Sequence, residues 1–244
     1  MINKIFLKIL TFLINLIDLS NKKKIINFFK KQFDHRKLNI FDIGCHKGET
    51  IELLSKNFNI NKIYAFEPNI KLFELLKKKN YDNKITLINA GVGLNEKPLD
   101  LNIMVDSSSS TFNNINSNTK YYKRKNKIIT FFSKKKGLIE NKQRISIINL
   151  SNFFLKHKLD NIDILKIDTE GFEYNILKGL NNIDFQKIKF IYFEHHYDLM
   201  IDKGYNFHDV NQLLIMNNFQ KKYKLKMKFR KSFEYIYENK KKSS

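Results

Sequence analysis

The sequence predicts an α/β fold with a mostly parallel sheet and helices on both of its faces. Three apolar runs of strand length support this prediction, because strands buried on both faces of a parallel sheet are apolar throughout. Ionisable residues lie at or just after the end of each run, which is the edge where such sheets bind ligands. The three runs are Leu38–Ile43, Lys62–Phe66 and Asp163–Ile167. With 244 residues, the chain can hold one such domain with a sizeable core.

The N-terminal part, residues 1–37, is predicted to be a helical extension. Residues 2–19 are strongly apolar, but Lys4, Lys8, Asn15 and Asp18 interrupt them, so the segment falls short of a spanning helix. It is expected to pack on the domain or on an oligomer partner. A helix that lies on a membrane surface is the alternative. Residues 27–36 are predicted to continue as a second helical piece.

The first strand leads into a turn and a helix. Gly44 and Gly48 bracket the turn, where missing side chains allow a ligand to approach the backbone. Glu49 lies in the first helical turn, where an acid complements the helix dipole. Strand, glycine turn and helix together predict half of a nucleotide-binding fold.

The second strand ends at Glu67, roughly 20 residues past the glycines, where an acid can accept both ribose hydroxyls of an adenosine group. A dinucleotide site normally needs a third glycine for the pyrophosphate. S-adenosylmethionine has no phosphate but carries an ammonium and a sulfonium, and Asp42 supplies negative charge nearby. The pattern therefore favours S-adenosylmethionine as the cofactor.

The middle of the chain continues the alternation of helices and strands. A helix is expected at Lys71–Lys79, and strands at Lys84–Ala90, Leu99–Val105 and Arg144–Ile148, followed by a helix at Ser151–Lys158. Asn89 and Ala90 end the third strand, where the backbone could border an adenine ring. Between these elements, Ser107–Thr111 is a candidate for substrate or cofactor contact. The basic, aromatic stretch Lys120–Lys136 is expected to form a lid, with a membrane-facing or single-stranded nucleic-acid loop as alternatives.

A second group of acids follows the strand at Asp163–Ile167. Asp168, Glu170 and Glu173 crowd its carboxyl end, and the later run Phe190–Tyr197 ends at Glu194 and His195. Parallel strands bring such ends to one edge of the sheet. After a last helix at Val210–Met216, the segments Phe219–Leu225 and Phe233–Tyr237 alternate like an antiparallel hairpin. The tail, residues 240–244, is expected to be disordered.

These motifs together resemble the FkbM-type S-adenosylmethionine-dependent methyltransferases, from about Leu38 to Tyr237. The matching residues are Asp42-Ile-Gly-Cys-His-Lys-Gly-Glu49, Ala65-Phe-Glu-Pro-Asn69, Asn89-Ala-Gly-Val92, Lys166-Ile-Asp-Thr-Glu-Gly-Phe-Glu173, Leu177-Lys-Gly179 and Phe193-Glu-His-His196. The resemblance implies a Rossmann-like class I methyltransferase domain over residues 38–239, with a seven-stranded, mostly parallel sheet that closes in an antiparallel hairpin. His46 stands where many members have Asn, and Ser151 where many have Asp, a change expected to alter only a local helix cap.

The site residues follow from the motifs and the resemblance. The residues expected to bind the cofactor are Asp42, Gly44, His46, Gly48, Glu49, Glu67, Pro68, Asn89 and Ala90. Asp168, Glu170 and His195 are the candidates for the base that takes a proton from an acceptor hydroxyl. Asp168 has the better position by analogy, and His195 the more suitable unperturbed pKa. The clustered acids lack a clear set of metal ligands, so no metal site is predicted.

The net charge of +21 suggests nucleic acid as a partner. Lysine provides most of that charge, however, and arginine recognises phosphate and guanine better. The expected reaction is O-methylation of a hydroxyl on a sugar, a glycan or a secondary metabolite. An RNA or DNA methyltransferase is one alternative, and a membrane-associated binding protein without catalysis is another. The single cysteine fits a reducing compartment, so a cytoplasmic protein is expected, with peripheral contact to the inner face of the membrane and a homo-oligomer as open options.

Overall fold

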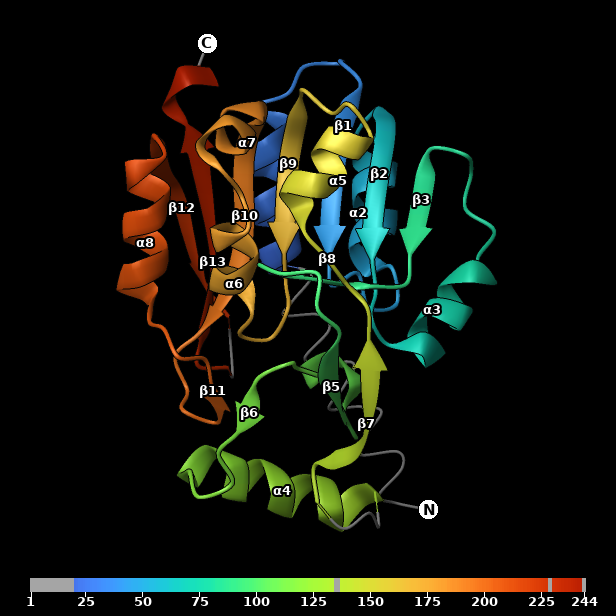
Figure 1. Cartoon of the computed structure of the whole chain (residues 1–244), viewed down its shortest axis with the longest axis vertical. Helices are drawn as coiled ribbons and strands as arrows, with labels where there is room; N and C mark the ends of the chain where they lie inside the picture. The colour runs from blue at the N-terminus through green and yellow to red at the C-terminus, as the bar shows by residue number, and fades with distance from the viewer. Residues whose placement is uncertain (1–19, 134–136, 228–229, 243–244) are drawn as a thin grey trace.

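The computed structural model describes residues 20–133, 137–227 and 230–242. Its main sheet has seven strands in the order β12-β13-β10-β9-β1-β2-β3. Their bounds are β1 Leu38–Ile43, β2 Ile60–Phe66, β3 Ile85–Ile88, β9 Ile162–Ile167, β10 Ile188–His196, β12 Phe219–Lys226 and β13 Ser232–Asn239. The strands from β3 to β10 are parallel, whereas β13 is antiparallel to both β10 and β12. The predicted α/β fold and its closing hairpin are confirmed (Figure 1).

The order of the strands reverses at β1. The chain runs outward through β2 and β3, and then returns to place β9 on the other side of β1, where Ile43 pairs with Ile167. In open α/β sheets a ligand binds at such a reversal, outside the carboxyl ends of the strands. The topology therefore locates the site before any side chain is considered.

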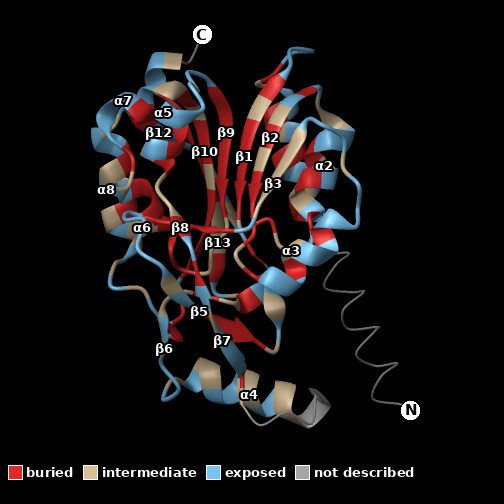
Figure 2. Ribbon diagram, turned by 45° about the vertical axis from the view of Figure 1, so that its right-hand side comes forward, coloured by how far each residue is buried: buried red, intermediate tan, exposed pale blue. Residues whose placement is uncertain are grey.

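Successive residues of the central strands point to opposite faces of the sheet and belong to two separate hydrophobic cores. Phe41 and Leu165 belong to one core, with α5 Leu150–Lys156, α6 Glu173–Lys178, α7 Asn182–Lys187 and α8 Phe207–Met216. Ile40 and Ile164 belong to the other core, with the helix at residues 20–30, α2 Glu49–Asn57 and α3 Ile70–Lys77. Figure 2 shows the buried strands between these helical layers. Burial on both faces explains why the strands are apolar throughout.

An insertion between β3 and β9 extends beyond the carboxyl ends of the sheet (Figure 1). Its antiparallel strands are β5 Leu99–Met104 and β7 Ile139–Ile145, and between them come η1 Ser107–Ser109, β6 Asn114–Ile115 and α4 Lys120–Ser133. The stretch expected to be a lid is therefore mainly the helix α4. The strand expected at Arg144–Ile148 is divided at Ser146, because β8 Ile147–Ile148 leaves β7 and pairs with β4 Gly91–Val92.

The described part of the N-terminal extension belongs to the domain. Ile25, Ile26 and Phe29 are at most 4% exposed and lie in the same core as β1 and α2. The prediction for residues 2–19 falls outside the described residues. Among the helices that are described, none is long and apolar enough to cross a membrane.

Two smaller expectations are corrected. The tail is folded as far as residue 242, because Lys240–Lys242 forms η2 and Lys242 Nζ donates hydrogen bonds to Lys187 O (2.6 Å) and Asn161 Oδ1 (2.9 Å). Ser151 does not cap its helix. Asn149 is the N-cap residue of α5, while Ser151 Oγ is bonded to Asp184 at the start of α7.

Candidate active site

A cavity of about 680 Å³ lies at the carboxyl ends of the strands and is bordered by the insertion. Its lining follows the order of the sheet: Ala90 after β3, Glu67 after β2, Gly44 after β1, Asp168 after β9, Glu194 on β10 and Glu234 on β13. The strand ends that the sequence marked with acids therefore meet at one cavity. The serine segment also reaches it through Ser107, Ser108 and Ser110.

The glycine turn has a different physical basis from the one expected. A Cβ on Gly44, at φ +80°, would lie 2.0 Å from the carbonyl oxygen of Asp168, and a Cβ on Gly48, at φ +85°, would lie 2.2 Å from Tyr81 Oη. At Gly44 the close atom belongs to the backbone, so packing and the left-handed conformation both require glycine there. At Gly48 the close atom is the end of a side chain, so the left-handed backbone is the main requirement. Gly44 lines the cavity, but Gly48 is not among its lining residues.

Glu67 is held rigidly at the end of β2. Its Oε2 accepts a hydrogen bond from the backbone N–H of His46 (2.8 Å), and its Oε1 accepts one from the N–H of Asn69 (2.9 Å). Burial raises the pKa of Glu67 to about 7, although both backbone bonds oppose the rise. Each carboxylate oxygen keeps acceptor capacity beyond these bonds, so the side chain can still receive the two hydroxyls of a ribose.

His46 ties the serine segment to the glycine turn. Its Nε2 lies 3.0 Å from Ser107 Oγ, and its Nδ1 lies 3.4 Å from Glu49 Oε1. Burial opposes ionisation of Glu49, but the hydrogen bond with His46 and a backbone bond lower its pKa to about 2. His46 and Glu49 both line the cavity, and Glu49 presents a carboxylate there at neutral pH.

The third strand end contributes in two ways. Pro68 and Ala90 line the cavity. The side chain of Asn89 instead donates to the carbonyl oxygens of Glu67 (2.8 Å) and Pro68 (3.3 Å). Asn89 is not among the lining residues, so it fastens the ends of β2 and β3 together.

Lys166 on β9 is a site residue to which the sequence analysis gave no role. Its Nζ lies 2.9 Å from Asp42 Oδ1 and 3.5 Å from Asp168 Oδ2, and it is almost fully buried. Burial opposes its charge, but the two carboxylates raise the pKa of Lys166 above its ordinary value. Asp42 is itself completely buried and faces Lys166, so it does not offer a free charge to a ligand, as had been expected. The signal in the sequence was a lysine next to the end of a buried strand whose other charged residue is Asp163.

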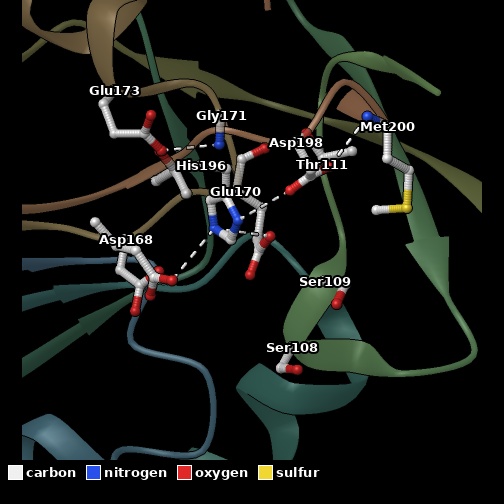
Figure 3. Close-up of polar contacts among 12 residues, drawn as sticks. Ser108, Ser109, Thr111, Asp168, Glu170, Gly171, Glu173, His196, Asp198 and Met200 are labelled. Carbon is white, nitrogen blue, oxygen red and sulfur yellow. Dashed lines mark hydrogen bonds and ion pairs between the residues drawn. The ribbon is translucent and has the colours of Figure 1, made fainter. Parts of the chain in front are cut away.

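Glu170 belongs to a second cluster, shown in Figure 3. Its Oε2 lies 3.3 Å from His196 Nε2, which is also 3.5 Å from Glu194 Oε1, while His196 Nδ1 lies 3.7 Å from Asp198 Oδ2. Burial disfavours the charge on His196, but Glu170, Asp198 and Glu194 raise its pKa to about 10. Burial also raises the pKa of Glu170 to about 7. Glu170 thus carries a carboxyl poised near neutral pH.

The backbone of Glu170 is held in the left-handed region, at φ 50°. Thr111 Oγ1 donates to its carbonyl oxygen at 2.8 Å, and Asn113 Nδ2 donates to the carbonyl oxygen of Gly171 at 2.6 Å. Such a conformation costs energy in a non-glycine residue and is often kept at functional sites. The insertion therefore positions Glu170.

His195 does not join these residues. Side chains alternate along a strand, and Glu194 and His196 contact each other on the cavity side. His195 instead packs against the rings of Tyr197, Tyr205 and Phe207, at centroid distances of 4.9, 5.8 and 5.7 Å. Burial and the neighbouring positive charges lower its pKa to about 3. The structure therefore does not place His195 where it could act as the base.

The donor set of the cavity fits the proposed cofactor. Seven carboxylates line it, against four lysine or arginine side chains, among the residues that the structure describes: Glu49, Glu67, Asp106, Asp168, Glu170, Glu194 and Glu234 against Lys22, Lys47, Lys166 and Arg230. An acidic cavity with a diol acceptor at Glu67 suits a nucleoside that carries a sulfonium. Within the described ranges, no group of three or more His, Cys, Asp or Glu could hold a metal ion.

A family model and several solved structures are similar to this chain. The FkbM methyltransferase domain matches residues 42–225. An FkbM methyltransferase from Methylobacillus flagellatus is 15% identical, with a TM-score of 0.49 over 82% of this chain and 44% of that one, so the chain spans less than half of that protein. A magnesium protoporphyrin IX methyltransferase from Synechocystis, with bound S-adenosylhomocysteine, is 9% identical, with a TM-score of 0.51 over 93% of this chain and 85% of that one.

No curated protein matches the sequence. The likeness to the Synechocystis enzyme, at 9% identity, shows the methyltransferase fold alone. The domain match is stronger evidence for the family, because residues 42–225 are most of the chain and include the strand ends that carry Glu67 and Asp168. The chain belongs to the FkbM methyltransferase family.

Proposed function

We propose that this chain transfers a methyl group from S-adenosylmethionine to a hydroxyl of a sugar, a glycan or a secondary metabolite. One observation carries the proposal: Glu67 and Glu170 line the same cavity from opposite sides of the β1–β9 reversal. S-adenosylmethionine supplies an electrophilic methyl group when it is bound. The side chains of the chain must then position the acceptor and take its proton.

The nucleoside end of the cavity lies at β2 and β3. Glu67 accepts the ribose hydroxyls, while Pro68 and Ala90 border the adenine ring. His46 holds Ser107 against this end (3.0 Å), and its N–H holds the Glu67 carboxylate in place (2.8 Å). Because these contacts exist within the protein itself, binding requires little rearrangement, which favours affinity.

Glu170 is the general base in this proposal. An alcohol must lose its proton as the methyl group is transferred, and a base is most effective when its pKa is near the working pH. The pKa of Glu170 is raised to about 7 by burial, and its carboxylate accepts the proton of the acceptor hydroxyl. Asp168 has a side chain that is 38% exposed beside Lys166, so it orients that hydroxyl.

The lining of the cavity disfavours the nucleic-acid alternative. Phosphate groups would meet seven carboxylates there, and like charges repel most strongly in a site of low dielectric. The basic residues responsible for the net charge of +21 lie mostly outside the cavity. They support non-specific adhesion to anionic polymers rather than their methylation.

The proposal is tested by following labelled methyl groups from S-adenosylmethionine into a panel of sugars, glycans and polyhydroxylated metabolites. Glu170→Gln is expected to lower kcat by about 10²–10⁴-fold and to remove the rise of kcat near pH 7, without changing the affinity for S-adenosylhomocysteine. His195→Gln serves as the control and is expected to retain activity. Label that appears on no hydroxyl, or undiminished turnover by Glu170→Gln, would contradict the assignment.

A further inference from the structure

Three acids form a continuous wall at one end of the cavity. Glu170, Glu194 and Glu234, hereafter the acidic wall, all line the cavity. Glu194 and Glu234 are directly opposite each other on the antiparallel pair β10–β13. Since neighbouring strands lie about 4.8 Å apart, the four steps from β2 to β13 place Glu234 about 19 Å from the strand that carries Glu67. The part of the acidic wall on β10 and β13 is therefore well separated from the nucleoside end.

This arrangement is unfavourable in the protein alone. Like charges directly opposite on paired strands destabilise a sheet, and burial of a carboxylate costs more when it has few partners. Glu194 is 6% exposed, and its Oε1 makes no hydrogen bond to any described residue. Among the described residues, its ion-pair partner is His196, whose Nε2 lies 3.5 Å from Glu194 Oε1. Glu234 accepts a hydrogen bond from the neutral hydroxyl of Tyr192.

The cations near the acidic wall do not balance its charge. Lys166 is engaged by Asp42 and Asp168, and His196 is shared among Glu170, Glu194 and Asp198. Arg230 also lines the cavity and has an interaction of its own. Even with these cations included, carboxylates remain in excess among the described residues that line the cavity, although the whole chain carries a charge of +21. From the composition of the chain alone, a cavity with an excess of positive charge would be expected.

We propose that the acidic wall binds a protonated amine of the acceptor, which is therefore a hydroxylated amine such as an amino-sugar unit. The inference rests on the proposed function and specifies its substrate class. An ammonium between Glu194 and Glu234 would supply hydrogen-bond donors to both carboxylates and remove their mutual repulsion. The same wall repels acceptors that carry a phosphate or a carboxylate. A neutral sugar would leave the repulsion in place.

The test measures binding to the full-length chain saturated with S-adenosylhomocysteine. Three related sugars serve as probes: glucose, glucosamine, which has an amine in place of the C2 hydroxyl, and glucuronic acid, which has a carboxyl group at C6. Calorimetry is expected to show glucosamine binding at least ~10-fold more tightly than glucose, and no binding of glucuronic acid. Glu234→Gln is expected to abolish that preference, because it keeps the shape and the Tyr192 contact but removes the charge. Glu74→Gln, an exposed acid on α3 that pairs with Lys77 (2.7 Å), is the matched control and is expected to keep it.

The outcomes separate this inference from the proposed function. If glucose binds as tightly as glucosamine, or if glucosamine does not bind while S-adenosylhomocysteine does, the amine-binding role is overturned and the methyltransferase assignment stands. If Glu234→Gln keeps the preference, the role is likewise overturned. If S-adenosylhomocysteine itself fails to bind, the proposed function is lost as well. Thermal unfolding of Glu234→Gln shows whether the variant is folded, and Glu194→Gln, expected to have the same effect, replaces it where it is not.

Discussion

Replacement of Lys166 by methionine tests the buried charge network beneath the site. Lys166 Nζ lies 2.9 Å from Asp42 Oδ1, and Asp42 is completely buried. The substitution keeps an apolar stem of similar length but leaves Asp42 without a cation. We expect the variant to lose much of its stability, because an uncompensated buried charge remains.

The expected size follows from the geometry. The Coulomb attraction between unit charges at 2.9 Å is about 6 kcal/mol at an effective dielectric constant of about 20. Removing one partner of a buried pair typically costs about 3–5 kcal/mol, which for a domain of this size lowers Tm by roughly 6–20 °C. Burial raises the pKa of Asp42 and Lys166 opposes the rise, so without Lys166 this carboxyl is protonated more readily. The loss should therefore be smaller at pH 5 than at pH 8.

The assay is urea unfolding of four proteins: the wild type, Lys166→Met, Asp42→Asn and the double variant. The double variant is expected to recover more than half of the lost stability, with a coupling free energy of at least about 2 kcal/mol. A Lys166→Met variant as stable as the wild type would refute the reasoning. A double variant no more stable than Lys166→Met would do so too, because the cost could then not come from Asp42.

Further predictions concern the turn, the cap and the response to pH. Gly44→Ala should cost stability and cofactor affinity, since its Cβ would lie 2.0 Å from Asp168 O, whereas Gly204→Ala, at φ +67° with nothing within 4 Å, should cost only about 1–2 kcal/mol of backbone strain. Equal losses in thermal unfolding would argue against the packing explanation. Asn69→Ala removes the N-cap of α3 and should lower the free energy of unfolding by about 1 kcal/mol. The affinity for S-adenosylhomocysteine should not change, because the backbone N–H of residue 69 still donates to Glu67. A large drop in that affinity would contradict this explanation. Burial raises the pKa of three cavity carboxyls (Glu67, Glu170 and Glu234) from 4.5 to about 7, so the folded chain holds protons that the unfolded chain has released. The free energy of unfolding should therefore fall as the pH rises from about 5 to 7, and urea unfolding that shows a rise would count against it.

The sheet and the meeting of its acidic ends could be predicted because buried parallel strands leave a clear pattern. Runs that are apolar on both faces imply parallel strands, and parallel strands place their carboxyl ends together. The choice between His195 and His196 could not be made in the same way. The strand β10 ends in three consecutive ionisable residues, Glu194, His195 and His196, and all three are buried. Their sequence therefore does not alternate between polar and apolar residues and does not show which of them face the cavity.

Contacts between segments that are far apart in the sequence could not be predicted either. Gly44 was linked with the approach of a ligand, although the atom nearest to its missing side chain is the backbone oxygen of Asp168, far away in the sequence. The acidic wall depends on the pairing of β10 with β13, which sets Glu194 opposite Glu234. The predicted hairpin concerned β12 and β13 instead, and it gave no pairing with β10. The register that sets these two acids opposite each other is visible only in the folded chain.

The affinity of the full-length chain for S-adenosylmethionine tests the central claim most directly. Calorimetry should show one binding site in the wild type. Glu67→Ala should weaken binding by at least ~10-fold, because two ribose hydroxyls lose a charged acceptor. Absence of binding in the wild type, or undiminished affinity in Glu67→Ala, would contradict the claim that this cavity holds the methyl donor.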